Sequence, residues 1–302
     1  MRTSRFIFLF ALILITSQSF AQKYIAYLPE DREFIGDENL IDESVINAIY
    51  CEILNIKENQ EVPVSETSMA WNSTNQIYYY RFTDLVNEKN SFEANIIHED
   101  PYNNPLKSVE ISDLKTEKIV EEWEYEYGES MVKKITVKRY LSGTDKPDIF
   151  EVIYDGNDDD FMQETIYTPK KTILQQTQNY YNFEDNEGYQ KVTKKYINDP
   201  PTLVQTDSVV HDKDYLKQAR YQTINDQTTK TTYKYGTKEI LTDEGENYLI
   251  MIESIQIDGK DSVRYEYEYD ENDNWNVRKT FEMKNEKWEY SSVIKRSITY
   301  KM

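Results

Sequence analysis

Apolar and charged residues alternate through most of the second part of the chain. Trp123, Tyr125 and Tyr127 fall on one parity, with glutamates between them, and the pattern returns in 263–269. A period of two residues is the signature of a β-strand with two unlike faces, because a helix would space its apolar residues three and four apart. One parity of the last segment is shared by Trp288, Tyr290, Ile294, Ile298 and Tyr300.

Turn-forming residues interrupt this alternation at regular intervals, for example at Asn225-Asp226 and Asp258-Gly259. Glycine, asparagine and aspartate tolerate the backbone conformations that tight turns need. The spacing predicts about fourteen strands in hairpin repeats of about 26 residues. We therefore expect a mainly β protein, an antiparallel β-meander. It should be curled or two-layered, because open twisted sheets rarely exceed roughly ten strands.

The amino-terminal part of the chain shows a different pattern. Val45, Ile49 and Ile53 are spaced four apart in 42–54, which predicts an amphipathic helix with Asp42 as its N-cap. Two short strands are expected after this helix. The sequence thus predicts a small N-terminal α+β cap module over 22–118, followed by a β-hairpin repeat domain over 119–302.

The first 21 residues have the organisation of a secretory signal peptide. Arg2 and Arg5 precede a run of ten apolar residues, 6–15, and Ser19-Phe20-Ala21 forms a small-residue cleavage site. Ten apolar residues are too few for a membrane-spanning helix, which needs about 20. We expect export to the periplasm, the cell surface or the extracellular space, with no membrane span in the mature chain.

Composition narrows the possible partners. The formal net charge is −20, which argues against binding nucleic acid through its phosphates. A barrel in the outer membrane is also not expected, because Lys279, Arg296 and Gln178 would interrupt its lipid-facing parity. Cys51 is the single cysteine, so no intrachain disulfide can form.

One segment resembles a known family. Tyr265 to Trp275 reads YEYEYDENDNW and is similar to the Y-x-Y-D-x-x-G-N-W motif of secreted YD-repeat (RHS-like) proteins of the Bacteroidota type. The closing run Arg296 to Tyr300 resembles the end of such chains. The resemblance is sharp over 265–300 and does not extend to 22–118. It implies a β-meander or β-shell, an exported location and no assigned activity. Asn274 stands where the family has a turn glycine.

A calcium site is one candidate for chemistry. Asp155, Asn157 and Asp159 lie in an acidic turn and could supply carboxylate and amide oxygens to Ca²⁺. The competing interpretation is a solvated hairpin tip whose side chains bond to their own backbone. No cofactor is otherwise expected.

An aromatic binding face is the second candidate. Rows of tyrosine and tryptophan on one face of a sheet can stack on sugar rings or hold a peptide strand. The residues proposed for this face are Trp123, Tyr125, Trp275, Trp288 and Tyr290. The competing interpretation is that the same rings form the hydrophobic core.

No catalytic motif supports an enzyme. His98 and His211 are the only histidines, and neither belongs to a nucleophile, zinc or phosphate-loop motif. The sequence favours an exported non-enzymatic β-repeat protein that binds a glycan, a peptide or an envelope component, or that has a structural role in the envelope. Two alternatives are a periplasmic carrier of an apolar ligand and a secreted polymer hydrolase.

Overall fold

The structure is a computed structural model. It describes residues 46–301 except for ten short gaps, namely 73–76, 89–90, 99–105, 129–131, 141–145, 158–160, 183–187, 198–199, 213–215 and 243–244. The predicted signal peptide lies outside the described residues. Within the described residues, no helix is long and apolar enough to cross a membrane.

All elements of the described chain are β-strands. In chain order they are β1 (Ile46–Lys57), β2 (Gln60–Trp71), β3 (Ile77–Asp84), β4 (Phe92–His98), β5 (Leu106–Asp113), β6 (Ile119–Tyr127), β7 (Val132–Arg139), β8 (Asp148–Asn157), β9 (Phe161–Tyr167), β10 (Ile173–Asn182), β11 (Gly188–Ile197), β12 (Thr202–His211), β13 (Lys217–Ile224), β14 (Gln227–Thr242), β15 (Gly245–Ile257), β16 (Lys260–Tyr269), β17 (Trp275–Lys284) and β18 (Lys287–Tyr300).

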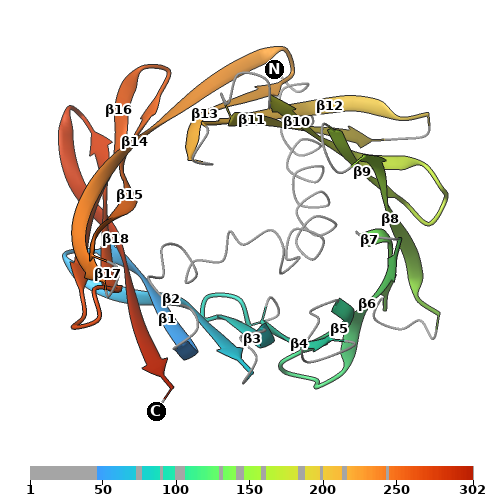
Figure 1. Ribbon diagram of the computed structural model, residues 1–302, viewed down its shortest axis with the longest axis horizontal. Helices are drawn as coiled ribbons and strands as arrows, with labels where there is room; N and C mark the ends of the chain where they lie inside the picture. The colour runs from blue at the N-terminus through green and yellow to red at the C-terminus, as the bar shows by residue number, and fades with distance from the viewer. Residues whose placement is uncertain are drawn as a thin grey trace, which may run out of the picture. The chain divides into compact units, whose positions relative to one another are not determined.

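These strands form one closed antiparallel barrel. Each strand pairs with its neighbours in sequence, and β18 returns to pair with β1, as in Cys51 opposite Arg296. Figure 1 looks down the barrel, with the blue β1 beside the red β18. Our expectation of a curled meander of about fourteen strands is therefore wrong. Local alternation cannot reveal a pairing between strands at the two ends of a chain, and closure also removes the exposed edges of an open sheet.

The predicted α+β cap is also wrong, because the proposed helix is the strand β1. Ile49 and Ile53 are four residues apart and so share a face in a strand as well as in a helix. Cys51 lies between them on the same face, opposite Arg296 on one side and Thr67 on the other. The strands β1 to β5 belong to the same sheet as β6 to β18.

The register separates a buried face from a hydrated face in the sector that runs from β16 through β18 and β1 to β8. Directly paired residues share a face, so Val109, Trp123 and Val137 form one row across β5, β6 and β7. Trp123 is 1% exposed and Val137 is 1% exposed. Side chains on the convex face of a barrel diverge, so a ring as large as that of Trp123 with 1% exposure belongs to the inner face. We call the opposite face the outer face.

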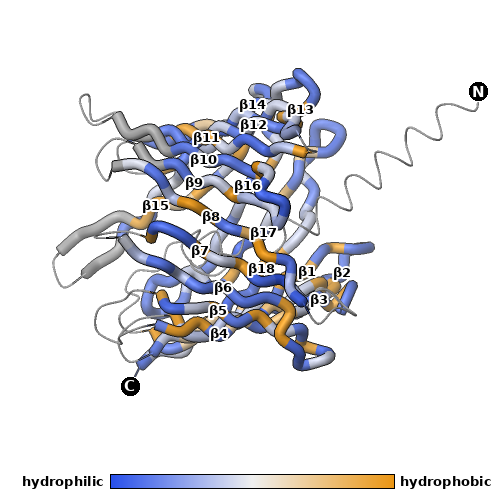
Figure 2. The backbone as a smooth tube through the Cα atoms, turned by 90° about the vertical axis from the view of Figure 1, so that its right-hand side faces the viewer, coloured by the Kyte–Doolittle hydropathy of each residue, from blue (hydrophilic) through white to orange (hydrophobic). Residues whose placement is uncertain are grey.

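Charged residues dominate the outer face of the same strands. Lys138 of β7 contacts Glu124 of β6 at 2.6 Å, and Lys134 lies 3.2 Å from Glu151 of β8. Such exposed pairs each contribute about 0.2–1 kcal/mol in water. Figure 2 accordingly shows hydrophilic and hydrophobic positions interleaved along the wall. These ion pairs give the outer face of β6 to β8 a charged surface.

The sector from β10 to β13 is polar on the inner face too. Thr177, Thr193 and Asp207 form one row across β10, β11 and β12, and Asp207 pairs with Arg220 of β13. Burial lowers the pKa of Lys195, and the nearby Asp207 opposes this shift. The inner face is thus apolar and aromatic over one sector and polar over the other.

Four hairpins close with two-residue turns whose residues have positive φ. These turns are Glu58-Asn59, Asn225-Asp226, Asp258-Gly259 and Asn285-Glu286. Two residues of positive φ match the twist of the flanking strands. The sequence correctly predicts three of these turns. Glu58-Asn59 falls inside the region predicted as a cap.

Candidate binding site

The five aromatic residues proposed from the sequence are divided between the two faces of the barrel. Trp123 and Trp275 are each 1% exposed, Tyr125 is 9% exposed, and all three belong to the inner face. Trp288 and Tyr290 are partly exposed and lie on the outer face. The structure therefore brings only two of the five together at the surface.

A β-bulge explains why the last segment does not keep one parity. Thr280 of β17 is opposite Ser292, but the next residue, Phe281, is opposite Tyr290, so Ser291 is an extra residue in β18. A bulge of this kind reverses the alternation on either side of it. Trp288 and Tyr290 therefore lie on the outer face. Contrary to the sequence pattern, the residues that follow the bulge on the same parity, Ile294, Ile298 and Tyr300, lie on the inner face.

The partly exposed rings of β17 and β18 gather around one arginine. Phe281 and Tyr290 have ring centroids 5.4 Å apart with planes at 34°. The guanidinium carbon of Arg264, on β16, lies 4.8 Å from the Phe281 ring centroid and 5.4 Å from that of Trp288. We call Arg264, Phe281, Trp288 and Tyr290 the outer aromatic cluster. Cation–π contacts of this kind fix the rings in place and contribute about 0.5–1 kcal/mol each at exposed sites.

Both acidic and basic groups lie beside the outer aromatic cluster, namely Glu266, Glu61, Lys279 and Lys295. Arg264 donates to Glu266 at 3.0 Å. Burial raises the pKa of the Tyr290 hydroxyl, and the carboxylate of Glu61 raises it further. Tyr290 therefore keeps its proton at neutral pH, and its hydroxyl is hydrogen-bonded to Glu61.

A groove of about 750 Å³ adjoins this cluster at the tips of two neighbouring hairpins. Met283 lines the groove and is directly opposite Trp288 in the register, so the groove and the cluster meet at this pair. The groove is lined by Ile257, Asp258, Lys260, Asp261, Ser262, Met283, Asn285 and Glu286. It thus combines two apolar side chains with carboxylate, amide and hydroxyl groups.

Sequence reasoning missed Arg264 and Phe281 as members of this site. Arg264 is one of the charged residues that alternate with apolar residues along β16, and Phe281 is one apolar residue within β17. Nothing in the sequence around either residue marks it as part of a binding site. They become neighbours because the register places Arg264 opposite Phe281. A prediction of strand pairing would have been needed to find them.

The inner face of the same strands carries a stack of cations and rings. The Arg296 guanidinium carbon lies 3.7 Å from the Trp275 ring centroid, and its Nε donates to the Trp275 carbonyl at 2.7 Å. Arg278 lies 5.7 Å from the same ring and 5.4 Å from that of Tyr265. Arg296 is 4% exposed, so this stack is part of the buried wall. The sequence pattern predicts that Lys279 and Arg296 lie on the same face of the sheet. Lys279 instead pairs with Glu268 on the outer face.

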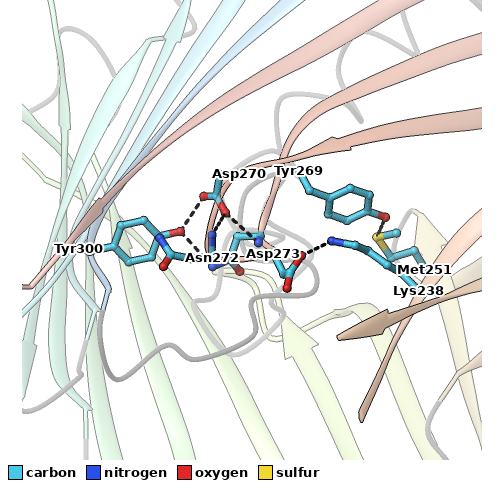
Figure 3. A network of polar contacts seen from close by, with 8 residues as sticks. Lys238, Met251, Tyr269, Asp270, Asn272, Asp273 and Tyr300 are labelled. Carbon is cyan, nitrogen blue, oxygen red and sulfur yellow. Dashed lines mark hydrogen bonds and ion pairs between the residues drawn. The ribbon is translucent and has the colours of Figure 1, made fainter. Parts of the chain in front are cut away.

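The turn between β16 and β17 is held by its own carboxylates. Asp270 Oδ1 accepts from the backbone N–H groups of Asn272 and Asn274, both at 3.0 Å. Its Oδ2 accepts from the Tyr300 hydroxyl at 2.7 Å, which ties the turn to the last residue of β18 (Figure 3). Lys238 of β14 pairs with Asp273 from the other side. These contacts make the turn a structural clamp across β14, β16 and β18.

The calcium candidate is only partly described. Asp155 is exposed near the end of β8, Asn157 closes that strand, and Asp159 lies outside the described residues. In the described part of the chain, no group of three or more histidine, cysteine, aspartate or glutamate side chains is placed to hold a metal ion. Calcium binding at 155–159 stays a prediction from the sequence.

Cys51 is expected to be inert as a nucleophile in the folded barrel. It is fully buried, and burial raises the pKa of its thiol to about 11, although Arg296 and Arg278 lower it in part. Only the thiolate attacks alkylating reagents, so the rate at pH 8 should be at least a hundredfold below that of a free thiol. Iodoacetamide labelling followed by mass spectrometry, in native buffer and in urea, measures this. Equal labelling rates in the two conditions would contradict the burial of β1.

Comparison with known proteins adds the following. No family model matches the chain, and no curated protein matches it. Among solved structures, it is similar to a porin-like protein from Bacteroides uniformis, with 11% identity over 84% of this chain and 98% of that chain and a TM-score of 0.35. A porin-like protein from Bacteroides vulgatus gives 11% identity, coverage of 82% and 97%, and a TM-score of 0.34. Likenesses this distant carry no argument about function.

The resemblance to secreted YD-repeat (RHS-like) proteins is wrong. The strands close into a barrel through β1 and β18 instead of forming an open repeat shell, and no family model matches the chain. The motif-like segment 265–275 has a local explanation. Tyr267 and Trp275 pack against each other with ring centroids 6.3 Å apart, and Asp270 organises the turn between them. Any hairpin that has an aromatic pair at its end and an aspartate that accepts hydrogen bonds in its turn can contain a similar run of residues.

Proposed function

We propose that the protein is an exported, non-enzymatic β-barrel of the cell envelope that binds carbohydrate chains at the outer aromatic cluster. The observation that carries this proposal is the position of partly exposed rings on a hydrated face, next to a groove lined with carboxylate, amide and hydroxyl groups. Sugar rings present apolar C–H faces and polar hydroxyl edges. A site for them needs aromatic surface and hydrogen-bonding groups side by side.

The rigidity of the site supports binding. Phe281, Trp288 and Arg264 sit on three adjacent strands, so the sheet fixes their relative positions. Little conformational entropy is then lost when a ligand docks, which favours affinity. The charged outer face supports a barrel that works in water, because a lysine or arginine near a bilayer midplane would cost about 2–4 kcal/mol.

Replacement of Trp288 by alanine is expected to weaken carbohydrate binding by at least tenfold, about 1.4 kcal/mol. The probes are hexamers of glucose, xylose, mannose and glucosamine, titrated by calorimetry into the secreted form of the chain. Tryptophan fluorescence offers a second reading, because Trp71, Trp123 and Trp275 are buried and Trp288 is partly exposed. Binding should therefore change the emission and iodide quenching of Trp288 alone.

Tyr78→Ala is the matched control for this experiment. Tyr78 is 48% exposed on β3, away from the cluster, so its loss should leave sugar binding unchanged. If none of the hexamers binds the unmodified protein, or if the two variants bind equally well, the carbohydrate proposal is wrong.

A second candidate function is the transport of an apolar ligand inside the barrel. It is favoured by the apolar and aromatic character of the inner face of β16 to β8, to which Ile135 and Phe92 belong. Barrels of 16–18 strands are too wide for wall side chains alone to fill. A rise in the fluorescence of 1-N-phenylnaphthylamine on binding, unaffected by Trp288→Ala, would favour this carrier. Absence of a rise would count against it.

A further inference from the structure

We propose that the groove selects carbohydrate chains that carry positive charge, that is, oligomers of amino sugars with free amines. This inference rests on the proposed carbohydrate function and names the ligand class of that same site. Its basis is the charge of the groove beside the outer aromatic cluster.

The groove lining has an excess of carboxylates. Asp258, Asp261 and Glu286 oppose the single cation Lys260, so three negative charges and one positive charge leave a net charge of −2. A ligand with protonated amines gains Coulomb attraction from this lining, and an acidic polysaccharide is repelled by it. The charge of the lining should therefore give cationic, neutral and anionic carbohydrate chains different affinities, whereas the aromatic rings alone would bind them with similar affinity.

The hydrogen-bond partners of these carboxylates leave their charge in place. Asp258 Oδ1 accepts from the backbone N–H of Lys230 at 2.8 Å, and Asp261 Oδ1 accepts from the side-chain amide of Gln256 at 2.8 Å. Both donors are neutral groups. They hold the carboxylates in fixed positions, so an incoming ammonium group meets charges that are already oriented.

The arrangement of apolar surface suits a sugar chain better than a flexible basic peptide. Met283 connects the groove to Trp288, and Phe281 and Tyr290 continue the ring surface along β17 and β18. A chain of rigid rings can lie on the cluster while its amines reach the carboxylates at the hairpin tips. We expect the rings and the charges to act on the same bound molecule.

The test compares four hexamers and one peptide on the unmodified protein at pH 6. The probes are the hexamers of glucosamine, N-acetylglucosamine, glucose and galacturonate, and hexalysine. We expect the glucosamine hexamer to bind at least tenfold more tightly than the two neutral hexamers, and the galacturonate hexamer to bind most weakly. The preference should shrink as salt is raised from 20 to 300 mM, because salt screens exposed charges.

Two variants and a matched control assign the effect to the groove. Asp261→Asn with Glu286→Gln should remove the preference for the glucosamine hexamer over the neutral hexamers, because the two amides keep hydrogen-bonding groups and lack the charge. Glu117→Gln is the control, because Glu117 is also an exposed turn glutamate, with φ of 55° against 61° for Glu286, and does not line the groove. It should change nothing. Trp288→Ala should weaken all hexamers that bind.

The outcomes separate this inference from the function on which it rests. Equal binding of glucosamine and neutral hexamers, with both lost in Trp288→Ala, overturns the charge preference and keeps the carbohydrate function. Absence of binding by every hexamer overturns both. Hexalysine binding as tightly as the glucosamine hexamer, and unaffected by Trp288→Ala, also overturns the inference, because the groove would then be a site for basic peptides. The comparison on the unmodified protein decides the matter even if the variants fail to fold.

Discussion

Replacement of Glu121 by alanine is expected to lower the free energy of unfolding by about 3–5 kcal/mol. Glu121 is on the inner face of β6 and is 1% exposed. It accepts from Trp123 Nε1 at 2.6 Å and from Arg139 Nε at 2.8 Å. Removal of the carboxylate leaves the guanidinium of Arg139, whose side chain is 12% exposed, and the buried indole N–H of Trp123 without this acceptor. Urea denaturation followed by circular dichroism measures the loss.

Glu124→Ala is the matched control on the same strand. Glu124 is a glutamate of the outer face and pairs with Lys138 at 2.6 Å, but its side chain is 56% exposed. Exposed ion pairs are screened by water, so this change should cost less than about 1 kcal/mol. Similar losses in the two variants would show that the faces of β6 have been assigned wrongly.

Removal of β18 is expected to abolish cooperative unfolding. A chain that ends at Asn285 loses the strand that pairs with both β17 and β1, so the barrel opens at two edges. The buried Val293, Ile294 and Arg296 are lost with it, and Trp275 loses the guanidinium that covers its ring. Deletion of a terminal strand from an open meander would remove one edge only and spare the other hairpins.

Differential scanning calorimetry distinguishes these two outcomes. The truncated chain should show no sharp transition, and a control that lacks only Lys301 and Met302 should melt like the full chain. A cooperative transition of nearly full enthalpy in the truncated chain would mean that β18 is dispensable and that the barrel is not closed by it.

The local pattern of the sequence was enough to predict strands and tight turns in the second half of the chain. The alternation around Trp123 and Tyr125 corresponds to β6, and Asp258-Gly259 is the two-residue turn between β15 and β16. These features depend on neighbouring residues only. The same reasoning mistook β1 for a helix, because a four-residue spacing such as that of Ile49 and Ile53 fits both periods.

Closure and the composition of the candidate site could not be predicted in the same way. The pairing of β1 with β18 joins segments about as far apart as the described chain allows, and no local signal specifies it. A single extra residue, Ser291, places Trp288 and Tyr290 on the opposite face from Ile294. A bulge leaves no mark in the alternation itself, so the sequence grouped rings that the barrel separates into a buried wall and an exposed cluster.

The most direct test of the closed barrel is a cross-link across its seam. Tyr50 and Ser297 are directly paired between β1 and β18, and a chain with Tyr50→Cys, Ser297→Cys and Cys51→Ser offers one thiol on each strand. A reference pair, Glu93→Cys with Ser112→Cys, spans the neighbouring strands β4 and β5 in the same Cys51→Ser background. Both pairs are treated with dibromobimane, a short reagent that joins two thiols, and the products are identified by mass spectrometry. The closed barrel predicts an intrachain link at similar yield in both proteins. A link in the reference pair but none between residues 50 and 297 would contradict closure.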